Sequence, residues 1–508
     1  MKRLFILSVL IAVCLVANAA RGKDGRRLRH NVACDTRSAA NRAYGFRSQD
    51  DWDASRTYGV PVVLMEFTDL SFSMETPAAT YDSLFNVHGY NRGHGLGCVV
   101  DYFRDQSGGL FNLRFDIIGP VRVNDVYKKN TDSNYGASAI REALNKSISQ
   151  LNNPDYDWNA DGEVESVIVV YAGVGGNESD DEATGCIWPH TNSYYINNVG
   201  GLDVDIVSVC PERWTSGGLC GIGTICHEFC HCLGLPDLYP VSNSDDADYS
   251  VLDEWDLMDG GNYTDDGWCP PNMSLHEKEF LGWATPVELT ATTAVSGMKT
   301  MDEGGVGYRI RPDLSSSTAD EYYLLENRQH RGWDYCLPGH GLLITHVDFS
   351  ASVWRSNRVN SYKNHYRLHY LNANNHSYPM DEALVPKGRQ YDKNKRSFYL
   401  AGTAYPYVSD TLVNRQLTDT SIPAATLFNR NTDGTLFMGK PILDIDESPE
   451  GLISFFFASN NSEAGLPLIR RSRDSSEGPL YDLQGRAMGK RPLRPGLYIK
   501  DRRKIIIQ

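Results

Sequence analysis

The sequence lacks three features that mark large classes of proteins. It has no excess of basic residues, because 49 Lys and Arg stand against 64 Asp and Glu and give a formal charge of −15. Such a charge argues against nucleic acid as a partner. Beyond the N-terminus it has no apolar run of the roughly 20 residues that a transmembrane helix needs, and no repeat of solenoid period. The 508 residues therefore predict a soluble, acidic protein of two or three domains.

The N-terminus has the three parts of a secretory signal. Two basic residues, a short apolar run and a small-residue cleavage site follow one another within residues 1–19. Of the 11 cysteines, Cys14 leaves with this signal, and export permits disulfides among the rest. Five cysteines lie between Cys210 and Cys232. We expect them to pack against or bridge to neighbours, rather than to form a zinc knuckle.

Composition divides the remaining chain into five segments. They are a polar leader at 20–56, a catalytic domain at 57–290, a β-rich domain at 291–459, a linker at 460–479 and a β tail at 480–508. Apolar runs at 58–67 and 165–173 predict buried strands, and 137–151 predicts an amphipathic helix. Short alternating strands dominate after Trp283. The predicted fold class is α+β, with a mixed sheet and an active-site helix, then a β-sandwich-like domain and a small β tail.

The string CHEFCHCLGLPDLY carries the chemistry. On a helix, His227 and His231 lie about 40° apart around the axis and about 6 Å apart along it, so both rings can reach one metal ion. Glu228 lies beside that metal, where it can hold and deprotonate a bound water. Gly234 lets the chain turn out of the helix, and Asp237 then follows at the spacing of a third ligand.

Asp237 departs from the commonest form of this motif. Zinc hydrolases use three protein ligands and keep a fourth position for water, and metzincins place a histidine at this position. A carboxylate is an acceptable ligand, but its charge should raise the pKa of the bound water and place more of the activation on Glu228. Downstream, Met258 precedes a Gly-Gly pair and fits the Met-turn that floors metzincin sites.

A second metal site is suggested by the string DWNADGEVE, just before a buried strand. Its alternating oxygen side chains and its glycine resemble the first half of an EF-hand loop. The last ligand position of that loop would be Ile168, which cannot chelate, so a full EF-hand is excluded. Two alternatives remain open. One is a smaller calcium loop of Asp157, Asn159, Asp161 and Glu165, and the other is a plain Asx turn.

Longer strings around the motif are similar to the immune inhibitor A family of secreted, metzincin-like zinc metallopeptidases. The family's HExxHxxGxxD is here HEFCHCLGLPD, and the other similar strings are VPVVLMEFTD, DYFRDQSGGLF, DWNADGEVESVIVVYAG, IWPH, WDLMDGG, EKEFLGW and ENRQHRGWDYCLPGHGLLITHVD. The resemblance runs from about residue 58 to 458. It implies a metzincin-like catalytic domain with His227, His231 and Asp237 as zinc ligands and Glu228 as the general base. It also implies calcium near Asp157.

Four more residues are candidates for roles around this centre. Tyr239 and Tyr263 are candidate hydrogen-bond donors to the oxyanion. His190 is either a pocket residue or a packed histidine. Cys34, in the leader, could cap the zinc as a thiolate until the leader is removed, or could instead be a disulfide partner or a free thiol.

The tail LYDLQGRAMGKRPLRPGLYIKDRRKIIIQ is similar to C-terminal sorting domains of type IX secretion. That resemblance implies a partner in the secretion machinery and a secreted or cell-surface location. The alternative is a further β-hairpin that stabilises the body.

The sequence as a whole predicts a secreted zinc endopeptidase, which hydrolyses peptide bonds of extracellular proteins through a zinc-bound water activated by Glu228. A surface adhesin or glycan-binding protein on a degenerate peptidase fold is the alternative. The β-rich region motivates this alternative, and the intact Glu228 argues against it.

Overall fold

The computed structural model describes most of the chain. The described residues are 46–128, 136–178, 181–241, 250–362, 364–376 and 396–463, with isolated strands at 19–21, 27–29, 480–481, 487–488, 496–500 and 503–507. The predicted signal up to Asn18 lies outside the described residues, as do Cys34 and most of the predicted leader and linker. Within the described part, no helix is both long and apolar enough to cross a membrane.

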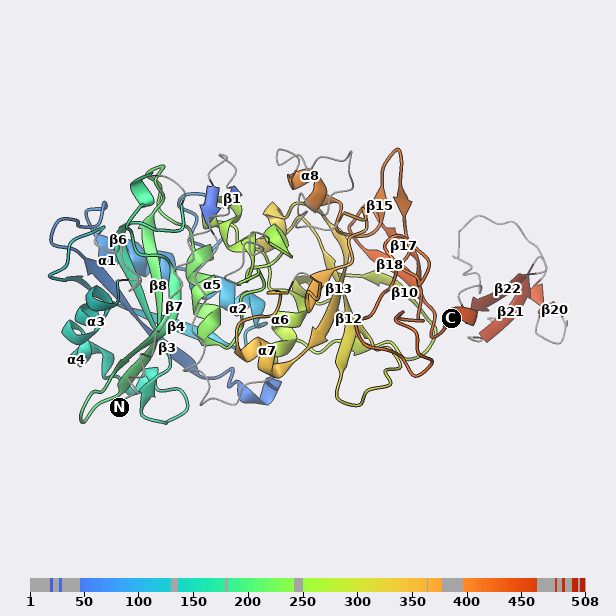
Figure 1. The fold of residues 1–508 in the computed structure, drawn as a ribbon, viewed down its shortest axis with the longest axis horizontal. Helices are drawn as coiled ribbons and strands as arrows, with labels where there is room; N and C mark the ends of the chain where they lie inside the picture. The colour runs from blue at the N-terminus through green and yellow to red at the C-terminus, as the bar shows by residue number, and fades with distance from the viewer. Residues whose placement is uncertain are drawn as a thin grey trace, which may run out of the picture.

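The N-terminal half is built on a six-stranded sheet (Figure 1). Its strand order is β4-β3-β6-β8-β5, and β7 also pairs with β8. The strands are β3 (Thr57–Glu66), β4 (Asn112–Arg122), β5 (Glu163–Val164), β6 (Val167–Val174), β7 (His190–Ile196) and β8 (Asp203–Arg213). All of the pairs are parallel except β7 with β8, which is antiparallel. The sheet is therefore mixed, as the sequence predicts.

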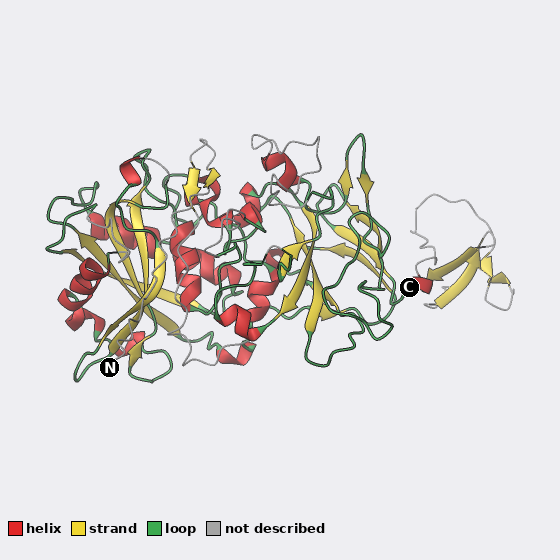
Figure 2. Ribbon diagram, in the orientation of Figure 1, coloured by secondary structure: helices red, strands yellow, loops and turns green. Residues whose placement is uncertain are grey.

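Both faces of this sheet are covered. Along β3, Val62 and Leu64 enter one hydrophobic core, whereas Val63 and Met65 enter another, because successive side chains of a strand point to opposite faces. Helices α3 (Ala137–Lys146) and α4 (Ile148–Leu151) cover one face. Helices α1 (Pro77–Asn86), α2 (Val99–Gln106) and α5 (Gly223–Cys232) cover the other (Figure 2). Burial on both faces explains why the parallel strands are continuous apolar runs.

The C-terminal half contains two further sheets. A five-stranded sheet has the order β14-β13-β12-β11-β9, and a three-stranded sheet has the order β10-β18-β17. The strands of the larger sheet are β9 (Val287–Glu288), β11 (Tyr308–Ile310), β12 (Asp320–Arg328), β13 (Gly341–Phe349) and β14 (Leu368–Tyr370). Those of the smaller are β10 (Thr293–Met298), β17 (Ile442–Glu447) and β18 (Ile453–Phe457). A short hairpin of β15 (Tyr407–Val408) and β16 (Val413–Asn414) lies nearby.

The five-stranded sheet packs against the N-terminal half rather than standing apart from it. On β12, Tyr322 and Leu324 join the core that contains α2 and α5, whereas Tyr323 and Leu325 join a core shared with the three-stranded sheet. Helices α6 (Leu275–Phe280) and α7 (Ala351–Arg355) lie between the two halves in Figure 1, and α8 (Arg396–Ala401) lies at one edge. Helix α5 is therefore enclosed by both halves.

Two small sheets complete the described elements. Strands β1 (Ala19–Arg21) and β2 (Arg27–Arg29) pair with each other. Strands β19 (Leu480–Tyr481), β20 (Ala487–Met488), β21 (Gly496–Lys500) and β22 (Arg503–Ile507) form an antiparallel sheet near the C-terminus. The strands and helices expected at 58–67, 165–173 and 137–151 are confirmed, although the last is divided at Ser147 into α3 and α4.

Candidate metal centre and active site

Helix α5 carries the histidine pair and is buried along its whole length. Its first turn lies so close to a neighbouring segment that a Cβ on Gly223 would be 2.0 Å from the carbonyl oxygen of Asn262, so only glycine fits there. On the sheet side, the hydroxyls of Thr191 on β7 and Ser208 on β8 donate to the carbonyl oxygen of Glu228 at 2.8 and 3.0 Å. The helix is therefore fixed from both sides.

The helix ends in a turn that requires glycine. Gly234 has a φ of +101°, outside the range that residues with a Cβ adopt readily. The Leu235 amide donates to the Cys230 carbonyl at 3.1 Å, and the Gly234 amide donates to the His231 carbonyl at 3.0 Å. These two bonds define a Schellman motif. The turn directs the chain back toward the histidines, so that Asp237 reaches them.

The two histidine rings are oriented by backbone carbonyls. His227 Nδ1 lies 2.8 Å from the carbonyl oxygen of Leu257, and His231 Nδ1 lies 2.8 Å from that of Leu235. A carbonyl oxygen can only accept a hydrogen bond, so each Nδ1 carries the hydrogen and each Nε2 presents a lone pair. Both Nε2 atoms lie 3.2 Å from Oδ1 of Asp237. Three ligand atoms thus converge on one point.

This cluster has the chemistry of a cation site. Oδ1 of Asp237 is buried and accepts no hydrogen bond, so three acceptor atoms face one another without a donor. In a tetrahedral zinc site with bonds of about 2.0–2.2 Å, neighbouring ligand atoms lie about 3.3–3.5 Å apart, close to the observed 3.2 Å. Protons can also occupy the place of a cation. Although burial opposes its charged form, the contact with Asp237 and the negative charges of Glu228 and Asp237 raise the pKa of His227 to about 9.

Glu228 lies beside the three ligand atoms. Burial raises the pKa of its carboxyl above 4.5, although the two histidines act in the opposite direction. Thr191 Oγ1 also lies 3.0 Å from Oε2, so its one hydroxyl hydrogen is shared between this oxygen and the Glu228 carbonyl. Oε1 makes no hydrogen bond with the described part of the chain. One oxygen is thus held in place and the other is available, which is the arrangement that a proton-transferring base needs.

The segment around Met258 forms hydrogen bonds to two parts of the centre. Met258 is fully buried, and its carbonyl oxygen accepts a hydrogen bond from the Leu238 amide at 2.8 Å. The neighbouring carbonyl of Leu257 holds His227, as described above. The turn itself is held by Asp256, whose Oδ1 accepts from the Met258 amide at 2.8 Å. One tight turn therefore orients one histidine and the segment that follows the third ligand.

The remaining candidates, Tyr239, Tyr263 and His190, differ in the residues that they contact. Tyr239 stacks on His227, with 6.4 Å between ring centroids. Burial, and then the neighbouring charge of Asp237, keep its pKa well above 10.0, so its hydroxyl stays protonated. Tyr263 accepts a hydrogen bond from Asn177 at 3.4 Å. Burial raises the pKa of Tyr263, the Asn177 hydrogen bond opposes that rise, and the charge of Glu228 adds to it. His190 bonds Trp188 and the Tyr194 hydroxyl, both at 2.5 Å, and is a packed histidine.

Two residues at the centre were missed by the sequence analysis. Thr191 holds the Glu228 side chain, and Asn357 donates from Nδ2 to Oδ2 of Asp237 at 2.6 Å. Asn357 lies 120 residues from the ligand that it contacts. Neither contact leaves a signal in the spacing of the motif, because both arise only when distant strands and loops are brought together.

A second group of three ligand-type residues is a helix cap. His88, Cys98 and Asp101 lie within 4.8 Å of one another. The Asp101 carboxylate, however, accepts from the amides of Gly89 and Cys98 and contacts His88 Nδ1 at 2.6 Å. The guanidinium of Arg104 lies 3.1 Å from the same carboxylate. The lone pairs are already satisfied and a positive charge is present, so this group closes the N-terminus of α2.

The predicted calcium residues form a turn of their own. Asp157 accepts from the amides of Asp161 and Gly162, and Asp161 accepts from that of Glu163. Asn159 Oδ1 also accepts from the Asp161 amide. Among the described residues, the carboxylates of Asp157, Asp161 and Glu165 do not form a group of three converging ligand atoms. The geometry is that of linked Asx turns, and calcium at this loop stays a prediction.

The cysteines around the motif are packed in the interior. Cys210, Cys226, Cys230 and Cys232 belong to the main hydrophobic core. Burial raises the pKa of the Cys226 and Cys230 thiols well above 9.0, so both remain protonated. No disulfide and no cysteine-rich metal group occurs among the described residues. These four cysteines are therefore packed in the core.

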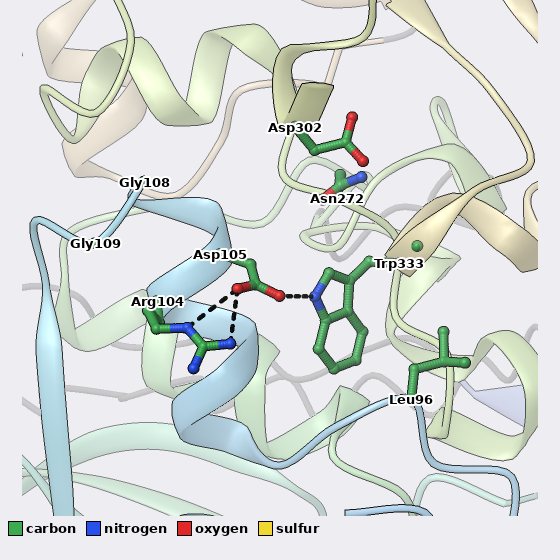
Figure 3. A pocket seen from close by; sticks show the side chains of 9 residues that line it. Leu96, Arg104, Asp105, Gly108, Gly109, Asn272, Asp302 and Trp333 are labelled. Atoms are coloured by element: carbon green, nitrogen blue, oxygen red, sulfur yellow. Dashed lines mark hydrogen bonds and ion pairs between the residues drawn. The ribbon is translucent and has the colours of Figure 1, made fainter. Parts of the chain in front are cut away.

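A cavity of about 630 Å³ is lined by residues outside this centre. Figure 3 shows its lining. The end of α2 contributes Arg104 and Asp105 to its lining, and the C-terminal half contributes Asp302 and Trp333. The Trp333 indole donates to Asp105 at 3.0 Å (Figure 3). None of the histidines of α5, Glu228 or Asp237 lines it. The converging lone pairs, rather than the size of a cavity, therefore mark the candidate active site.

Comparison with known proteins gives an independent view of the same region. Residues 76–284 match the family described as Immune inhibitor A peptidase M6, catalytic domain. Immune inhibitor A of Bacillus thuringiensis subsp. alesti is 24% identical, over 45% of this chain and 41% of that protein. Pre-pro-metalloprotease PrtV of Vibrio cholerae serotype O1 is 24% identical, over 45% of this chain and 28% of that protein.

The match covers only part of this chain and part of each relative. The chain spans less than half the length of these relatives. The matched segment contains α5, Asp237 and Met258 but ends before Asn357. Residues 76–284 are thus similar to the catalytic domain of immune inhibitor A peptidases, and together with the converging ligand atoms the comparisons support a metallopeptidase.

Proposed function

We propose that this protein is a secreted zinc endopeptidase that hydrolyses peptide bonds of extracellular proteins. The observation that carries the proposal is the meeting of two histidine lone pairs with an unpartnered carboxylate oxygen, each 3.2 Å away. Two nitrogen ligands and one oxygen ligand from the protein are one of the donor sets of catalytic zinc sites, which keep a further position for water or substrate. Glu228 beside them supplies the base that a degenerate binding protein would not need.

The chain's own residues divide the reaction between them. Zinc, when bound by His227, His231 and Asp237, would supply a Lewis acid and lower the pKa of water. Oε1 of Glu228 takes the proton from that water and later passes it to the leaving amine. Thr191 contacts Oε2, and Oε1 is the atom proposed to receive the proton. Because burial raises the pKa of Glu228, this pKa is closer to that of the leaving amine than the pKa of an exposed glutamate would be.

The two tyrosines are proposed to act differently. The hydroxyl of Tyr263 lies within electrostatic reach of Glu228 and remains protonated, which suits it to donate to the developing oxyanion. Tyr239 stacks on His227 and interacts with the Asp237 carboxylate, so it serves the ligands more than the substrate. Tyr263→Phe should therefore lower kcat, and Tyr239→Phe should chiefly weaken metal binding.

Strand β7 offers a place for an extended substrate. Within the described residues it pairs only with β8, so its other side is a sheet edge. Its Thr191 contacts Glu228, which brings this edge next to the base. A peptide that added to β7 by main-chain hydrogen bonds would lie beside the metal centre with little dependence on its side chains. This arrangement favours protein and peptide substrates over compact ligands.

Export and anchoring remain part of the proposal. The signal-like segment 1–19 and the tail 480–508 support secretion, with the tail engaging the secretion machinery. Calcium at the Asp157 loop is proposed as a stabilising ion. Deleting residues 480–508 should leave the purified protein active but retain it inside the producing cell. Calcium should raise the melting temperature of the wild-type protein, and less so that of Asp157→Asn.

The central test is the variant Glu228→Gln. We expect it to bind zinc as the wild type does and to lose about 10²–10⁴-fold of its activity on casein. The control is Glu142→Gln, a change in a partly exposed ion pair with Lys146 on α3, which should retain activity. Asp237→Ala should lower zinc occupancy measured by elemental analysis. Full proteolysis by Glu228→Gln, or undiminished zinc in Asp237→Ala, would refute the assignment.

A further inference from the structure

Asn357 holds the third metal ligand with both ends of its amide. Its Nδ2 donates to Oδ2 of Asp237 at 2.6 Å, and its Oδ1 accepts from the Asp237 backbone amide at 2.7 Å. Asp237 is fully buried and Asn357 is 2% exposed, so water does not replace either bond. The two bonds fix both the backbone and the carboxylate plane of Asp237. Oδ2 is occupied as a result, and Oδ1 faces the histidines.

The backbone at Asn357 is shaped for this contact. Its φ is +53°, in the left-handed region that asparagine adopts more readily than other residues with a Cβ. The position follows α7, and the Asn357 amide donates to the Trp354 carbonyl at 3.0 Å. The Trp354 indole in turn donates to His276 Nε2 at 3.2 Å. The segment that carries Asn357 is therefore anchored on α6 before it reaches Asp237.

A second asparagine anchors the same segment without touching the ligand. Asn360 Nδ2 donates to the carbonyl oxygens of Leu238 and Leu368, at 2.7 and 2.8 Å. The Leu368 amide returns a bond to its Oδ1 at 3.1 Å. Asn360 thus ties the start of β14 to the residue after Asp237. It shares the structural role of Asn357 but has no contact with the carboxylate, which makes it a natural control.

We propose that Asn357 is a positioning residue for the metal, supplied by the C-terminal half of the chain. It lies outside the segment 76–284 that matches the peptidase catalytic domain. By holding Oδ2, it presents Oδ1 to the point where the two Nε2 atoms converge and reduces the reorganisation that metal binding requires. Outer hydrogen bonds of this kind typically contribute about 10–100-fold to metal affinity. The inference rests on the proposed zinc site and makes the C-terminal half a part of it.

The test compares four full-length variants with the wild type. Asn357→Gly keeps the left-handed backbone and removes both side-chain bonds. Asn357→Asp keeps the shape but places a second carboxylate against Asp237. Asn360→Ala weakens the segment without touching the ligand. Asn375→Gly changes an exposed asparagine of similar φ, +55°, elsewhere in the chain. For each, the zinc dissociation constant is measured by competition with a chromogenic chelator, alongside the melting temperature of the metal-free protein and the absorption spectrum of the cobalt form.

Asn357→Gly should raise the zinc dissociation constant about 10–100-fold, and Asn357→Asp should raise it further because like charges repel. Both should alter the cobalt spectrum, and excess zinc should restore part of the cleavage of casein by Asn357→Gly. Asn375→Gly should bind zinc as the wild type does. If Asn357→Gly fails to fold, the isosteric Asn357→Asp decides the question by the same measurements.

Two results would overturn the inference. One is a zinc dissociation constant for Asn357→Gly, or for a folded Asn357→Asp, within twofold of the wild type. The other is an equal weakening in Asn360→Ala, which would mean that the segment matters and the amide does not. A wild-type protein that binds no zinc and cleaves nothing would instead remove the proposed function, and this inference with it.

Discussion

Two clusters in this molecule contain the same kinds of residue and differ in what satisfies them. His227, His231 and Asp237 meet with a carboxylate oxygen that accepts no hydrogen bond. His88, Cys98 and Asp101 meet with a carboxylate that accepts two backbone amides and contacts a guanidinium. The first cluster has an open position suited to a cation, and the hydrogen bonds of the second are complete without one. Proximity of ligand-type residues is therefore a poor guide to a metal site, and unsatisfied lone pairs are a better one.

The largest expected difference between the clusters concerns zinc itself. His231→Ala removes one of three ligands, so it should abolish zinc binding and reduce proteolysis to background. His88→Ala removes an exposed ring from a capped helix and should leave both properties unchanged. Elemental analysis after gel filtration and a casein assay measure the two variants together. Loss of zinc in His88→Ala would show that both clusters hold metal and would break the comparison.

Replacing each aspartate by asparagine separates ligation from folding. Asp237→Asn should lower zinc affinity by at least about 10-fold, because the amide is a poorer ligand. Asp101→Asn should keep zinc affinity and lower the free energy of unfolding by about 1–2 kcal/mol, because it weakens the cap of α2. Chelator competition and urea denaturation of the metal-free proteins give the two quantities. A lower zinc affinity in Asp101→Asn, with an unchanged zinc affinity in Asp237→Asn, would contradict these roles.

Acid should act on the capping cluster in a defined direction. Burial alone would raise the pKa of Asp101, but hydrogen bonds from His88, Gly89 and Cys98 lower it below 3.8. A depressed pKa gives stability that is present above the unfolded-state value and is lost as the pH falls through the folded value. The stability difference between wild type and Asp101→Asn should therefore shrink as the pH falls from about 5 to about 3. A difference that is constant with pH would contradict this account.

The smallest effect is expected for Cys98→Ser. Cys98 Sγ accepts the Asp101 amide at 3.4 Å as the N-cap of α2, and a serine hydroxyl can accept the same bond. The free energy of unfolding should change by less than about 1 kcal/mol, and zinc content should stay the same. A fall in zinc content would identify Cys98 as a ligand and would show that the capping cluster also binds metal.

Much of the site could be predicted because its information is local. The spacing of His227 and His231 specifies one helix face, and Gly234 allows the turn that returns Asp237 to it. Strands such as β3 and β6 were predicted because burial on both faces makes them continuous apolar runs. The division of the helix at Ser147 was not foreseen, because its apolar periodicity continues through the break.

Other parts of the site depend on contacts that no local pattern encodes. Thr191 meets Glu228 because β7 lies against α5, and Asn357 meets Asp237 across 120 residues of sequence. The packing of β12 on both halves could not be read from its alternation, since a strand buried on both faces has no polar side to orient it. The loop at Asp157 shows the converse limit, because its sequence resembles a calcium loop while its oxygens bond the loop's own amides.

The sequence by itself determined which side chains meet in the candidate site, because helical periodicity and one glycine turn bring them together within eleven residues, from His227 to Asp237. Tertiary structure decided how those side chains are oriented. The carbonyls of Leu257 and Leu235 select the histidine tautomers, and Asn357 sets the carboxylate plane. Orientation of a lone pair to within a few tenths of an ångström depends on hydrogen bonds from elements that are distant in the chain, and only folding supplies them.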